Sequence, residues 1–386
     1  MLRYLTAGES HGQGLVVVVE GLPAGLPVTV EEVQGELARR RLGYGRGPRM
    51  RFEADVVTLV GGVRHGRTLG SPVAIEIANS EWRRSDRWHQ EMSPAPGRTA
   101  APLTQPRPGH ADLAGMQKYG FTDARDVLER ASARETAARV AAGCLAKALL
   151  ARLGVSVLSH VVRIGSVASK AAERPTPADR ERVDASPIRC SDPAAEEAMV
   201  AEIRAAASDG DSLGGVVEVL AYGVPVGLGS HVHWDRKLDG RLAHALVSIP
   251  AVKAVEIGDA FDVATRRGSV AHDPISWDAA SARYRRASSL AGGIEGGIST
   301  GELLVARATM KPLATLNRPV LATVDVETKE ETVSFKERTD VTAVPAMGVV
   351  AETMVSLVLA DEAARKFGGD SVEELVRNRD AFLASL

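Results

Sequence analysis

Apolar residues recur along the chain in two ways. Short β-branched or alternating runs predict strands, and apolar residues spaced three or four apart predict helices. The β-branched run Leu15–Glu20 predicts a first strand, which the glycine- and proline-rich segment 21–25 ends. Thr29–Glu32 has the spacing of a capping box and predicts a helix that continues to Arg41. A second capping box opens the alanine-rich segment Ser132–Gly154, which predicts the longest amphipathic helix of the first half.

The same periods predict the remaining elements. Strands are expected over Asp55–Leu59, Pro72–Ala78, Val155–Val167, Gly214–Leu220, Val252–Ile257, Glu302–Ala308 and Val320–Val326. Helices are expected over Asp192–Asp209, Lys237–Val247 and Pro345–Phe367. Neither period is visible between Trp82 and Gln105, which predicts a surface excursion. Strands and helices alternate imperfectly, which favours a large α/β or α+β unit over a doubly wound sheet.

A weak internal repeat suggests two related halves. Residues 17–25 and 217–227 each form a strand, a Gly/Pro turn and the approach to a helix. No low-complexity linker separates the halves, so we expect residues 1–386 to form one unit.

Composition narrows the class of protein. Among 386 residues, 47 Lys+Arg balance 49 Asp+Glu, so no overall positive field attracts nucleic acid or an anionic membrane. The longest strictly apolar run, Leu15–Val19, is far shorter than the roughly 20 residues of a membrane-spanning helix. The N-terminus lacks a signal-peptide profile, which predicts a cytoplasmic protein. Cys144 and Cys190 are too few for a disulfide framework and are expected to be buried thiols.

An arginine cluster is the first candidate site. Six arginines and no acidic residue lie between Leu37 and Phe52. Arg39–Arg41 end the predicted helix, where cations meet the negative end of the helix dipole. Arg46 and Arg49 lie in a loop with three glycines, and guanidinium groups suit paired hydrogen bonds to phosphate or carboxylate. The cluster predicts a site for a small anion.

Two histidines lie in glycine turns rather than on a periodic face. They are His11, within Gly8–Gly12, and His110, within Arg107–Asp112. An unperturbed histidine titrates near neutral pH, so one beside a bound phosphate could donate a proton to that phosphate as it departs. The residues alone leave this role and a purely structural one equally open.

Further segments could contact an anion or a planar ligand. The predicted helix N-terminus at Ser132, flanked by Arg130 and Arg134, offers free amide N–H groups. Gly292–Gly301 has five glycines in ten residues and could lie flat against a ring. Lys311–Thr315 adds a cation and a hydroxyl group.

Glu337–Asp340 adds an arginine and carboxylates in a segment without periodicity. A carboxylate among cations normally forms a salt bridge, so to act as a base Asp340 must face the substrate.

A metal site receives little support. His231 and His233, followed by Asp235, have strand spacing with no further ligand close in sequence. Two alternative functions remain open from the residues alone. A nucleic-acid-binding regulatory module would use the arginine loop, although few aromatic residues are there to stack on bases. A metal-dependent phosphohydrolase would use His11, His110, Asp112, His231 and His233.

Seven motifs, in order along nearly the whole chain, resemble the chorismate synthase family. They are Gly8–Gly12, Arg39–Arg46, Arg107–Asp112, Arg130–Thr136, Asp209–Asp211, Trp234–Leu238 and Gly292–Gly297. The resemblance implies a 1,4-anti elimination of phosphate from 5-enolpyruvylshikimate 3-phosphate that gives chorismate, the last common step of the shikimate pathway to the aromatic amino acids. It also implies a need for reduced FMN without net redox change.

The resemblance assigns roles to residues of this chain. Ser10, Arg40, Arg46, Arg49 and Arg134 would hold the phosphate and carboxylates of the substrate. Three residues would be catalytic: His11 as the acid beside the leaving phosphate, His110 protonating or hydrogen-bonding the reduced flavin ring, and Asp340 passing a proton by way of flavin atom N5.

The implied FMN contacts come from several segments. They are Arg130, Ala131, Ser132, Ala133, Ala251, Gly296, Lys311, Pro312, Leu313, Ala314, Thr315 and Arg338. Ala131 and Pro250 depart from the usual Ser and Asn of the family, so contacts there would come from the backbone.

No metal is implied. The implied fold is a large unit of helices sandwiched between antiparallel sheets, with internal pseudo-symmetry, which assembles as a homotetramer. NADPH could serve as an indirect reductant, and the lack of a reductase domain favours reduced flavin from an external flavin reductase.

Overall fold

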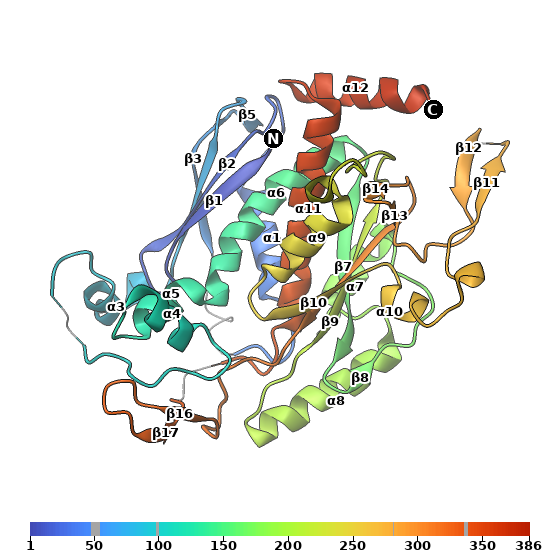
Figure 1. The fold of residues 1–386 in the computed structure, drawn as a ribbon. Helices are drawn as coiled ribbons and strands as arrows, with labels where there is room; N and C mark the ends of the chain where they lie inside the picture. Colours follow the sequence, from blue (N-terminus) through green and yellow to red (C-terminus); the bar gives the residue numbers. More distant parts are fainter. Residues whose placement is uncertain (48–54, 98–99, 281, 336–338) are drawn as a thin grey trace.

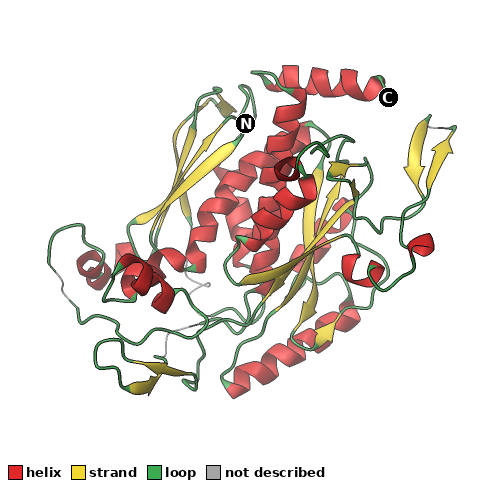
Figure 2. Ribbon diagram, viewed as in Figure 1, coloured by secondary structure: helices red, strands yellow, loops and turns green. Residues whose placement is uncertain are grey.

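Helices fill the middle of the molecule, and an antiparallel sheet covers them on each side (Figures 1 and 2). The structure is a computed structural model that describes residues 1–47, 55–97, 100–280, 282–335 and 339–386. This is the sandwich of helices between antiparallel sheets that the family resemblance implies, and it agrees with the large α/β or α+β unit that the sequence pattern predicts.

The first sheet has the strand order β1-β2-β6-β3. Its strands are β1 (Arg3–Gly8), β2 (Gly14–Glu20), β6 (Val73–Ala78) and β3 (Val56–Gly61). Along β2, Leu15, Val17 and Val19 are buried against the helices, whereas Val16 and Val18 are exposed on the outer face. The period of two therefore fixes which face of the sheet meets the core.

The second sheet has the order β10-β15-β9-β7-β8. Its strands are β10 (Val252–Ile257), β15 (Leu304–Met310), β9 (Gly215–Tyr222), β7 (Ser156–Ile164) and β8 (Val167–Ala168). Neighbouring strands are antiparallel throughout.

The two halves repeat one topology. Apart from α8 (Pro193–Asp209) and several short elements, the chain order β1-β2-α1-β3-β6-α6 is matched by β7-β9-α9-β10-β15-α11. The four strands also pair in the same order in each sheet, with the second and fourth strands of each half in the middle. The two related halves that the weak repeat suggested are confirmed.

Four helices form the middle layer. They are α1 (Val30–Arg41), α6 (Thr136–Arg152), α9 (Leu238–Val247) and α11 (Val344–Phe367). The capping box at the start of α1 is confirmed, because the Thr29 side chain accepts from the Glu32 amide and the Glu32 carboxylate accepts from Thr29.

Helix α11 packs against α6 and against both β7 and β9. It is long and apolar enough to cross a membrane, yet 94% of its most apolar window is buried. A helix that is apolar on all sides and covered on all sides is a core helix rather than a membrane span.

The predicted start of α6 needs correction. Ser132 accepts a hydrogen bond from the Arg134 amide (3.2 Å), but a 3₁₀ turn, η2 (Ala133–Glu135), intervenes before the α-helix begins at Thr136. Glu135 pairs with Arg139 (2.7 Å), one turn ahead, which removes it from the reciprocal contact that a capping box requires.

The other elements lie around the sandwich. The helices are η1 (Trp82–Arg84), α3 (Asp86–Glu91), α4 (Asp112–Tyr119), α5 (Arg125–Ala131), η3 (Pro177–Asp179), α7 (Arg180–Ala185), α8 (Pro193–Asp209), η4 (Trp234–Arg236), α10 (Ala260–Val263), η5 (Gly268–Val270) and α12 (Val372–Ala384). The short strands are β4 (Val63–Arg64), β5 (Arg67–Thr68), β11 (Ile275–Asp278), β12 (Arg283–Arg286), β13 (Ile294–Glu295), β14 (Ile298–Ser299), β16 (Ala322–Val324) and β17 (Glu331–Val333). The predicted excursion after Trp82 is mostly loop, but α3 interrupts it.

Candidate active site

Three helix ends meet at one end of the middle layer: the C-terminus of α1 and the N-termini of α6 and α11 (Figure 1). Arg40, in the last turn of α1, donates from Nε to Thr136 Oγ1 and from Nη2 to the carbonyl oxygen of Ala133, both at 3.0 Å. Gly43 follows α1, and a Cβ there would lie 2.9 Å from Pro345 Cβ in the first turn of α11. Most of the predicted substrate-binding residues lie around these ends.

His11 is held from two sides. Its ring nitrogen Nδ1 lies 2.9 Å from Oε1 of Glu129, and its backbone N–H donates to Oε2 of the same carboxylate (2.9 Å). The ring of Trp88, on α3, stacks on the imidazole with centroids 3.9 Å apart. The other ring nitrogen, Nε2, lies 3.4 Å from Glu81. The imidazole is therefore held in one orientation by Glu129, Trp88 and Glu81.

The ionisation of Glu129 follows from these contacts. Burial alone would raise the pKa of its carboxyl group, but the hydrogen bonds and charge of His11 and the charge of Arg125 lower that pKa below the ordinary value. Glu129 is thus a carboxylate at neutral pH, and an acceptor there selects the His11 tautomer with hydrogen on Nδ1.

Ser10, Ser132 and Arg134 continue this group. Ser132 Oγ donates to Ser10 Oγ (3.1 Å) and accepts from the Arg134 amide. The buried Arg134 guanidinium donates from Nε to Asn79 (3.0 Å) and from Nη1 to Asp55 (2.6 Å). Within the described part of the chain, its third nitrogen, Nη2, is buried without a hydrogen-bond partner. A buried donor in that state costs about 1–3 kcal/mol, which an anionic ligand would recover.

The arginine cluster has no acidic residue near it in sequence, but the fold brings acidic residues to it. Arg39 pairs with Asp184 (2.7 Å) and with Glu352 (2.8 Å), residues that are far away in sequence. Arg39 and Arg40 also point inward instead of decorating the helix end. Long side chains at a helix terminus reach acids on other elements, which spacing along the chain does not reveal.

Arg46 and Asp340 lie side by side. Arg46 Nε is 3.1 Å from Asp340 Oδ2, and the Gly47 amide donates to Asp340 Oδ1 (2.6 Å). Asp340 therefore carries the salt bridge expected of a carboxylate among cations, and a role as base requires that Arg46 turns toward a ligand instead.

A second group surrounds His110. Arg107 donates to Asp112 (2.8 Å) and to Thr315 Oγ1 (3.1 Å), while His110 Nδ1 lies 2.5 Å from Asp112 Oδ1. Lys311 Nζ donates to the carbonyl oxygen of Gly109. Two of the predicted flavin-binding elements, His110 and the segment 311–315, are thus brought together.

Asp112 is the fixed anion of this second group. Burial alone would raise the pKa of its carboxyl group, but hydrogen bonds from His110 and Arg107 and the charge of Arg107 hold that pKa well below its usual range. A permanent carboxylate at Nδ1 fixes the orientation of the His110 ring and leaves Nε2 for a ligand.

Ser212 and Leu213 link the segment next to His110 to the Arg46–Asp340 pair. Ser212 Oγ donates to the Leu313 carbonyl (2.8 Å), and the Leu213 amide donates to the Val341 carbonyl (2.8 Å), next to Asp340. On the other side, the Ala251 carbonyl accepts from the Lys311 amide (3.0 Å), so Ala251 adjoins the same segment. The motif Asp209–Asp211 leads directly into this linking chain.

Some predicted residues lie apart or outside the description. Gly296 is in the β13–β14 turn at the beginning of α9, whereas Ala251 follows the end of that ten-residue helix, about 15 Å long. Arg130 holds the end of β1 through the Thr6 and Gly8 carbonyls. Arg49 and Arg338 lie outside the described residues.

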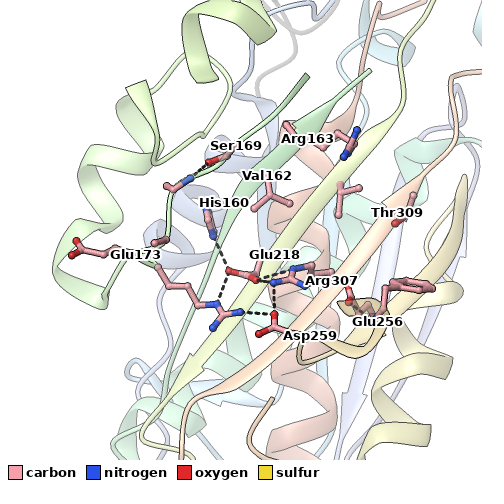
Figure 3. A pocket seen from close by; sticks show the side chains of 16 residues that line it. His160, Val162, Arg163, Ser169, Glu173, Glu218, Glu256, Asp259, Arg307 and Thr309 are labelled. Carbon is pink, nitrogen blue, oxygen red and sulfur yellow. Dashed lines mark hydrogen bonds and ion pairs between the residues drawn. The ribbon is translucent and has the colours of Figure 1, made fainter. Parts of the chain in front are cut away.

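A hollow of about 540 Å³ lies elsewhere, on the outer face of the second sheet (Figure 3). Its floor is a row of opposite charges on four neighbouring strands, and His160, Glu218, Arg307 and Glu256 lie opposite one another in register. Glu218 pairs with His160 (3.2 Å) and with Arg307 (2.7 Å). Because these charges satisfy one another, we interpret the row as a sheet-stabilising feature.

A possible metal site and the two cysteines were also considered in the sequence. His233 pairs with Asp235 (2.8 Å) in an exposed loop, and among the described residues no group of three or more His, Cys, Asp or Glu is arranged to hold a metal ion. Cys144 and Cys190 are buried free thiols, as predicted, and burial raises the pKa of Cys144 to about 12.

The sequence interpretation missed several partners of the predicted residues. Glu129 immediately precedes the Arg130–Thr136 motif, and Asn79 immediately follows the predicted strand Pro72–Ala78, so the position of each next to a predicted feature was a signal. Trp88, 77 residues away from His11, had none beyond being one of four tryptophans.

Comparisons with known proteins agree on one family. The family model for chorismate synthase matches residues 2–364. The chorismate synthase of Salinispora tropica is 62% identical over 395 aligned residues, covering 100% of this chain and 99% of that protein. The chorismate synthase of Acidothermus cellulolyticus is 60% identical with the same coverage. A crystal structure of chorismate synthase superimposes with a TM-score of 0.80 at 39% identity, covering 100% of this chain and 98% of that one.

These findings replace the two alternatives left open by the residues, and they confirm the predicted fold class. With the family model spanning almost the whole chain and full-length relatives at about 60% identity, the chain belongs to the chorismate synthase family, the carbon–oxygen lyases that supply chorismate for aromatic amino acid biosynthesis.

Proposed function

We propose that the two groups of side chains form one active site, in which residues around His11 bind 5-enolpyruvylshikimate 3-phosphate and residues around His110 bind reduced FMN. One observation carries the proposal. Arg134 presents a buried Nη2 atom without a hydrogen-bond partner among the described residues, and Ser132 and Ser10 link it to the fixed imidazole of His11. A buried cation with a spare donor beside a histidine suits the capture and protonation of a leaving phosphate.

The substrate anions would be shared among arginines. Arg40 and Arg134, with Ser10, flank the first turn of α6, and Arg46 approaches from the loop after α1. Arg49, from outside the described residues, is proposed to complete the set. As an imidazolium, His11 would carry hydrogen on both ring nitrogens, so that Nε2 could donate to the phosphate oxygen while Nδ1 stays on Glu129.

The residues around His110 fit the phosphate and ring of a flavin mononucleotide. Lys311, Arg107 and the Thr315 hydroxyl form a donor set of two cations and one hydroxyl group. A Cβ at Gly109, where φ is +76°, would come within 3.1 Å of Lys311 Nζ, so glycine leaves room for a ligand beside the lysine. When bound, reduced FMN supplies electron density to the breaking allylic C–O bond without net redox change.

Within that site, Asp112 would keep hydrogen on Nδ1 of His110, so Nε2 would face the ligand and would donate to it in the imidazolium form. Asp340 would accept a proton at its carboxylate once Arg46 engages the substrate. Backbone atoms of Ala131, Ser132, Ala133, Ala251, Pro312, Leu313 and Ala314, with Arg130, Gly296 and Arg338, complete the proposed flavin contacts.

We further propose that residues 1–386 act as one catalytic unit in a cytoplasmic homotetramer. One apolar cluster runs through both sheets and the helices between them, which supports a single unit. Leu5, Val16, Val18 and Val60 are exposed on the outer face of the first sheet, which supports a subunit contact there. Light scattering on the purified chain measures the assembly.

An anaerobic assay tests the function. The chain should release phosphate and chorismate from 5-enolpyruvylshikimate 3-phosphate with dithionite-reduced FMN, and should be inactive with oxidised FMN. Activity with oxidised FMN and NADPH would show intrinsic flavin reduction, whereas we expect an external flavin reductase to be needed. Arg134→Lys should raise the substrate KM by about 10- to 100-fold, because a lysine cannot make the same paired contacts. Arg139→Gln, five residues further along, is the matched control.

A further inference from the structure

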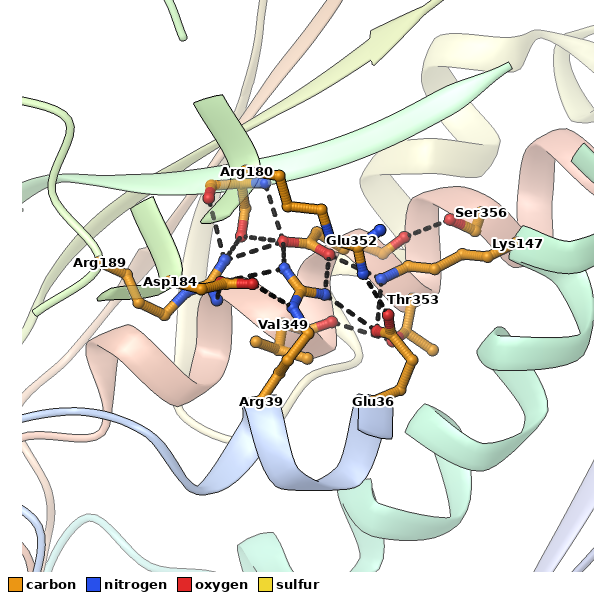
Figure 4. Close-up of polar contacts among 11 residues, drawn as sticks. Glu36, Arg39, Lys147, Arg180, Asp184, Arg189, Val349, Glu352, Thr353 and Ser356 are labelled. Carbon is orange, nitrogen blue, oxygen red and sulfur yellow. Dashed lines mark hydrogen bonds and ion pairs between the residues drawn. The ribbon is translucent and has the colours of Figure 1, made fainter. Parts of the chain in front are cut away.

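A group of charged side chains lies buried between α1, α6 and α11, and the roles proposed above leave it unused (Figure 4). We call it the Glu352 cluster; its members are Glu36, Arg39, Lys147, Arg180, Asp184, Arg189 and Glu352. The Glu352 side chain, at the middle of α11, has no exposed surface. Its carboxylate accepts from Arg39 Nη1 (2.8 Å) and Nη2 (3.0 Å), from Lys147 (2.6 Å) and from Arg189 (3.0 Å).

Three of these ion pairs close a triangle of helices. Arg39–Glu352 joins α1 to α11 (2.8 Å), and Lys147–Glu352 joins α6 to α11 (2.6 Å). Glu36 completes the triangle, because Lys147 Nζ also lies 2.7 Å from its carboxylate and so joins α6 to α1. Hydrogen bonds between charged groups depend on distance and angle, whereas apolar contact is not directional. The ion pairs therefore restrict sliding and rotation of the packed helices more than apolar contact does.

Stability alone is a poor explanation for such a cluster. Burial alone would raise the pKa of Glu352, but Arg39, Lys147 and Arg189 hold that pKa well below its usual range, so the group stays ionised. Buried ion pairs give little net stability compared with apolar residues of the same volume. The cluster is better explained by its fixing the positions of the three helices relative to one another.

The helices of the triangle are the helices that carry the active site. Arg40 follows Arg39 in α1 and contacts Thr136 and Ala133 at the beginning of α6. A small rotation or slide of α1 against α6 would displace the Arg40 guanidinium directly. Misplacement of a substrate-holding group by about 1 Å can lower catalytic efficiency by about 100-fold.

We propose that Glu352 is a positioning residue which, through Arg39 and Lys147, fixes α1 against α6 and thereby places Arg40 for the anionic groups of the substrate. This inference rests on the assignment of Arg40 to substrate binding in the proposed function. Lys311–Thr315, assigned to the flavin, lies on none of the three helices. Ala131–Ala133, also assigned to the flavin, adjoin the first turn of α6, so the cluster is expected to affect substrate affinity more strongly than flavin affinity.

Two variants test the proposal. Glu352→Gln leaves three buried cations around a neutral amide and can prevent folding. Asp184→Asn is milder, because Asp184 supports Arg39 Nε (2.7 Å) from the partly exposed edge of the cluster. Asp184→Asn should raise the substrate KM about tenfold, and Glu352→Gln, where folded, about 10- to 100-fold. The dissociation constant of FMN should change by a smaller factor than the substrate KM in both.

Two controls change neighbours without touching the triangle. Ser356→Ala removes a buried hydroxyl group that donates to the Glu352 backbone carbonyl (2.7 Å) one turn earlier along α11. Arg182→Gln alters the same short helix as Asp184, where Arg182 pairs with Asp179 (3.0 Å). Both should keep the parent KM for the substrate.

The outcomes separate this proposal from the function on which it rests. Arg40→Gln with unchanged substrate affinity would refute the assignment of Arg40. If Arg40→Gln weakens substrate binding but Asp184→Asn lowers only the melting temperature, the positioning role of the cluster is wrong. Equal weakening of substrate and FMN binding would also overturn it. The proposal also predicts the double variant. When Arg40→Gln has already removed the guanidinium group of Arg40, adding Asp184→Asn should raise the substrate KM less than twofold further, because both changes act through that group.

Discussion

The carboxylate of Glu129 holds both the ring and the backbone of His11. Nδ1 lies 2.9 Å from Oε1, and the His11 amide donates to Oε2 at 2.9 Å. Glu129 is on α5, 118 residues further along the chain, so this contact also joins the loop after β1 to the helix that precedes the active-site turn. Orientation of the proposed acid therefore depends on a residue with no role in proton transfer to the substrate.

Removal of that carboxylate should lower turnover through His11. His11→Ala should lower kcat about 10²- to 10⁴-fold, the range for loss of a general acid. Glu129→Gln should lower kcat at least tenfold or so, because an amide cannot accept from both N–H groups in the same way. The double variant should be no slower than His11→Ala, as measured by single-turnover release of phosphate.

The control for this pair is Glu91→Gln. Glu91 also contacts Arg125 (3.2 Å), which pairs with Glu129, but lies outside the His11 contacts. It should retain the parent kcat. Multiplicative losses in the double variant would mean that Glu129 acts independently of His11.

Sequence patterns predicted the buried elements of this fold well and the exposed ones poorly. Strand β9 and helices α6 and α11 have long apolar runs because they are covered on most sides. Strand β2 has such a run although its outer face, with Val16 and Val18, is exposed. Strand β1 was missed because its outward positions include Leu5 and Ala7 while its inward ones include Thr6, so its alternation gives no polar–apolar contrast. The β11–β12 hairpin, with Trp277 and Tyr284 exposed, was missed because it packs on no core that would impose a period.

The sequence indicated which residues form the site but not which residues they contact. Glycine turns and clustered arginines indicated His11, His110 and the end of α1 from local sequence. Their partners come from distant segments: Glu352 is 313 residues from Arg39, and Asp340 follows Arg46 by almost 300. Pairing at such separations depends on tertiary packing, so the cluster read as free of acids is in fact neutralised by them.

A matched pair of glycines tests the close packing of the middle layer. A Cβ on Gly143, in α6, would lie 1.9 Å from the Thr353 side chain of α11. Gly143→Ala should therefore lower the free energy of unfolding by about 1–3 kcal/mol through overpacking. Gly35, in α1, has no atom within 4 Å of its Cβ position, so Gly35→Ala should raise that free energy by up to about 1 kcal/mol. Urea unfolding measures both, and destabilisation of equal size would contradict the packing argument.

Lys311 provides a test of the flavin site that does not depend on turnover. Lys311→Ala should weaken FMN binding about 10- to 100-fold, because it removes a cation from a donor set otherwise made of Arg107 and Thr315. Isothermal titration with FMN gives the affinity directly. Lys329→Ala, on the exposed β16–β17 hairpin, is the control and should bind FMN as the parent does. Unchanged FMN affinity in Lys311→Ala would remove the segment 311–315 from the proposed site.

The charge row on the second sheet predicts how stability depends on acid. Burial alone would raise the pKa of Glu218, but the hydrogen bond from His160 and the charges of Arg174 and Arg307 lower it from 4.5 to about 2. A folded-state pKa below the unfolded value means that the carboxylate stabilises the fold fully above about pH 4.5 and loses this contribution as the pH falls toward 2.

The shift corresponds to about 3 kcal/mol for this buried group. Glu218→Gln should therefore be less stable than the parent at pH 6, and the difference in unfolding free energy between the two proteins should shrink steadily below pH 4.5. Glu20→Gln, which breaks an exposed pair with Arg3, should follow the parent at every pH because such pairs contribute little. Denaturant titrations at pH 6, 5, 4 and 3 measure the differences. Parallel curves for Glu218→Gln and the parent would show that the ionisation of Glu218 is not linked to folding.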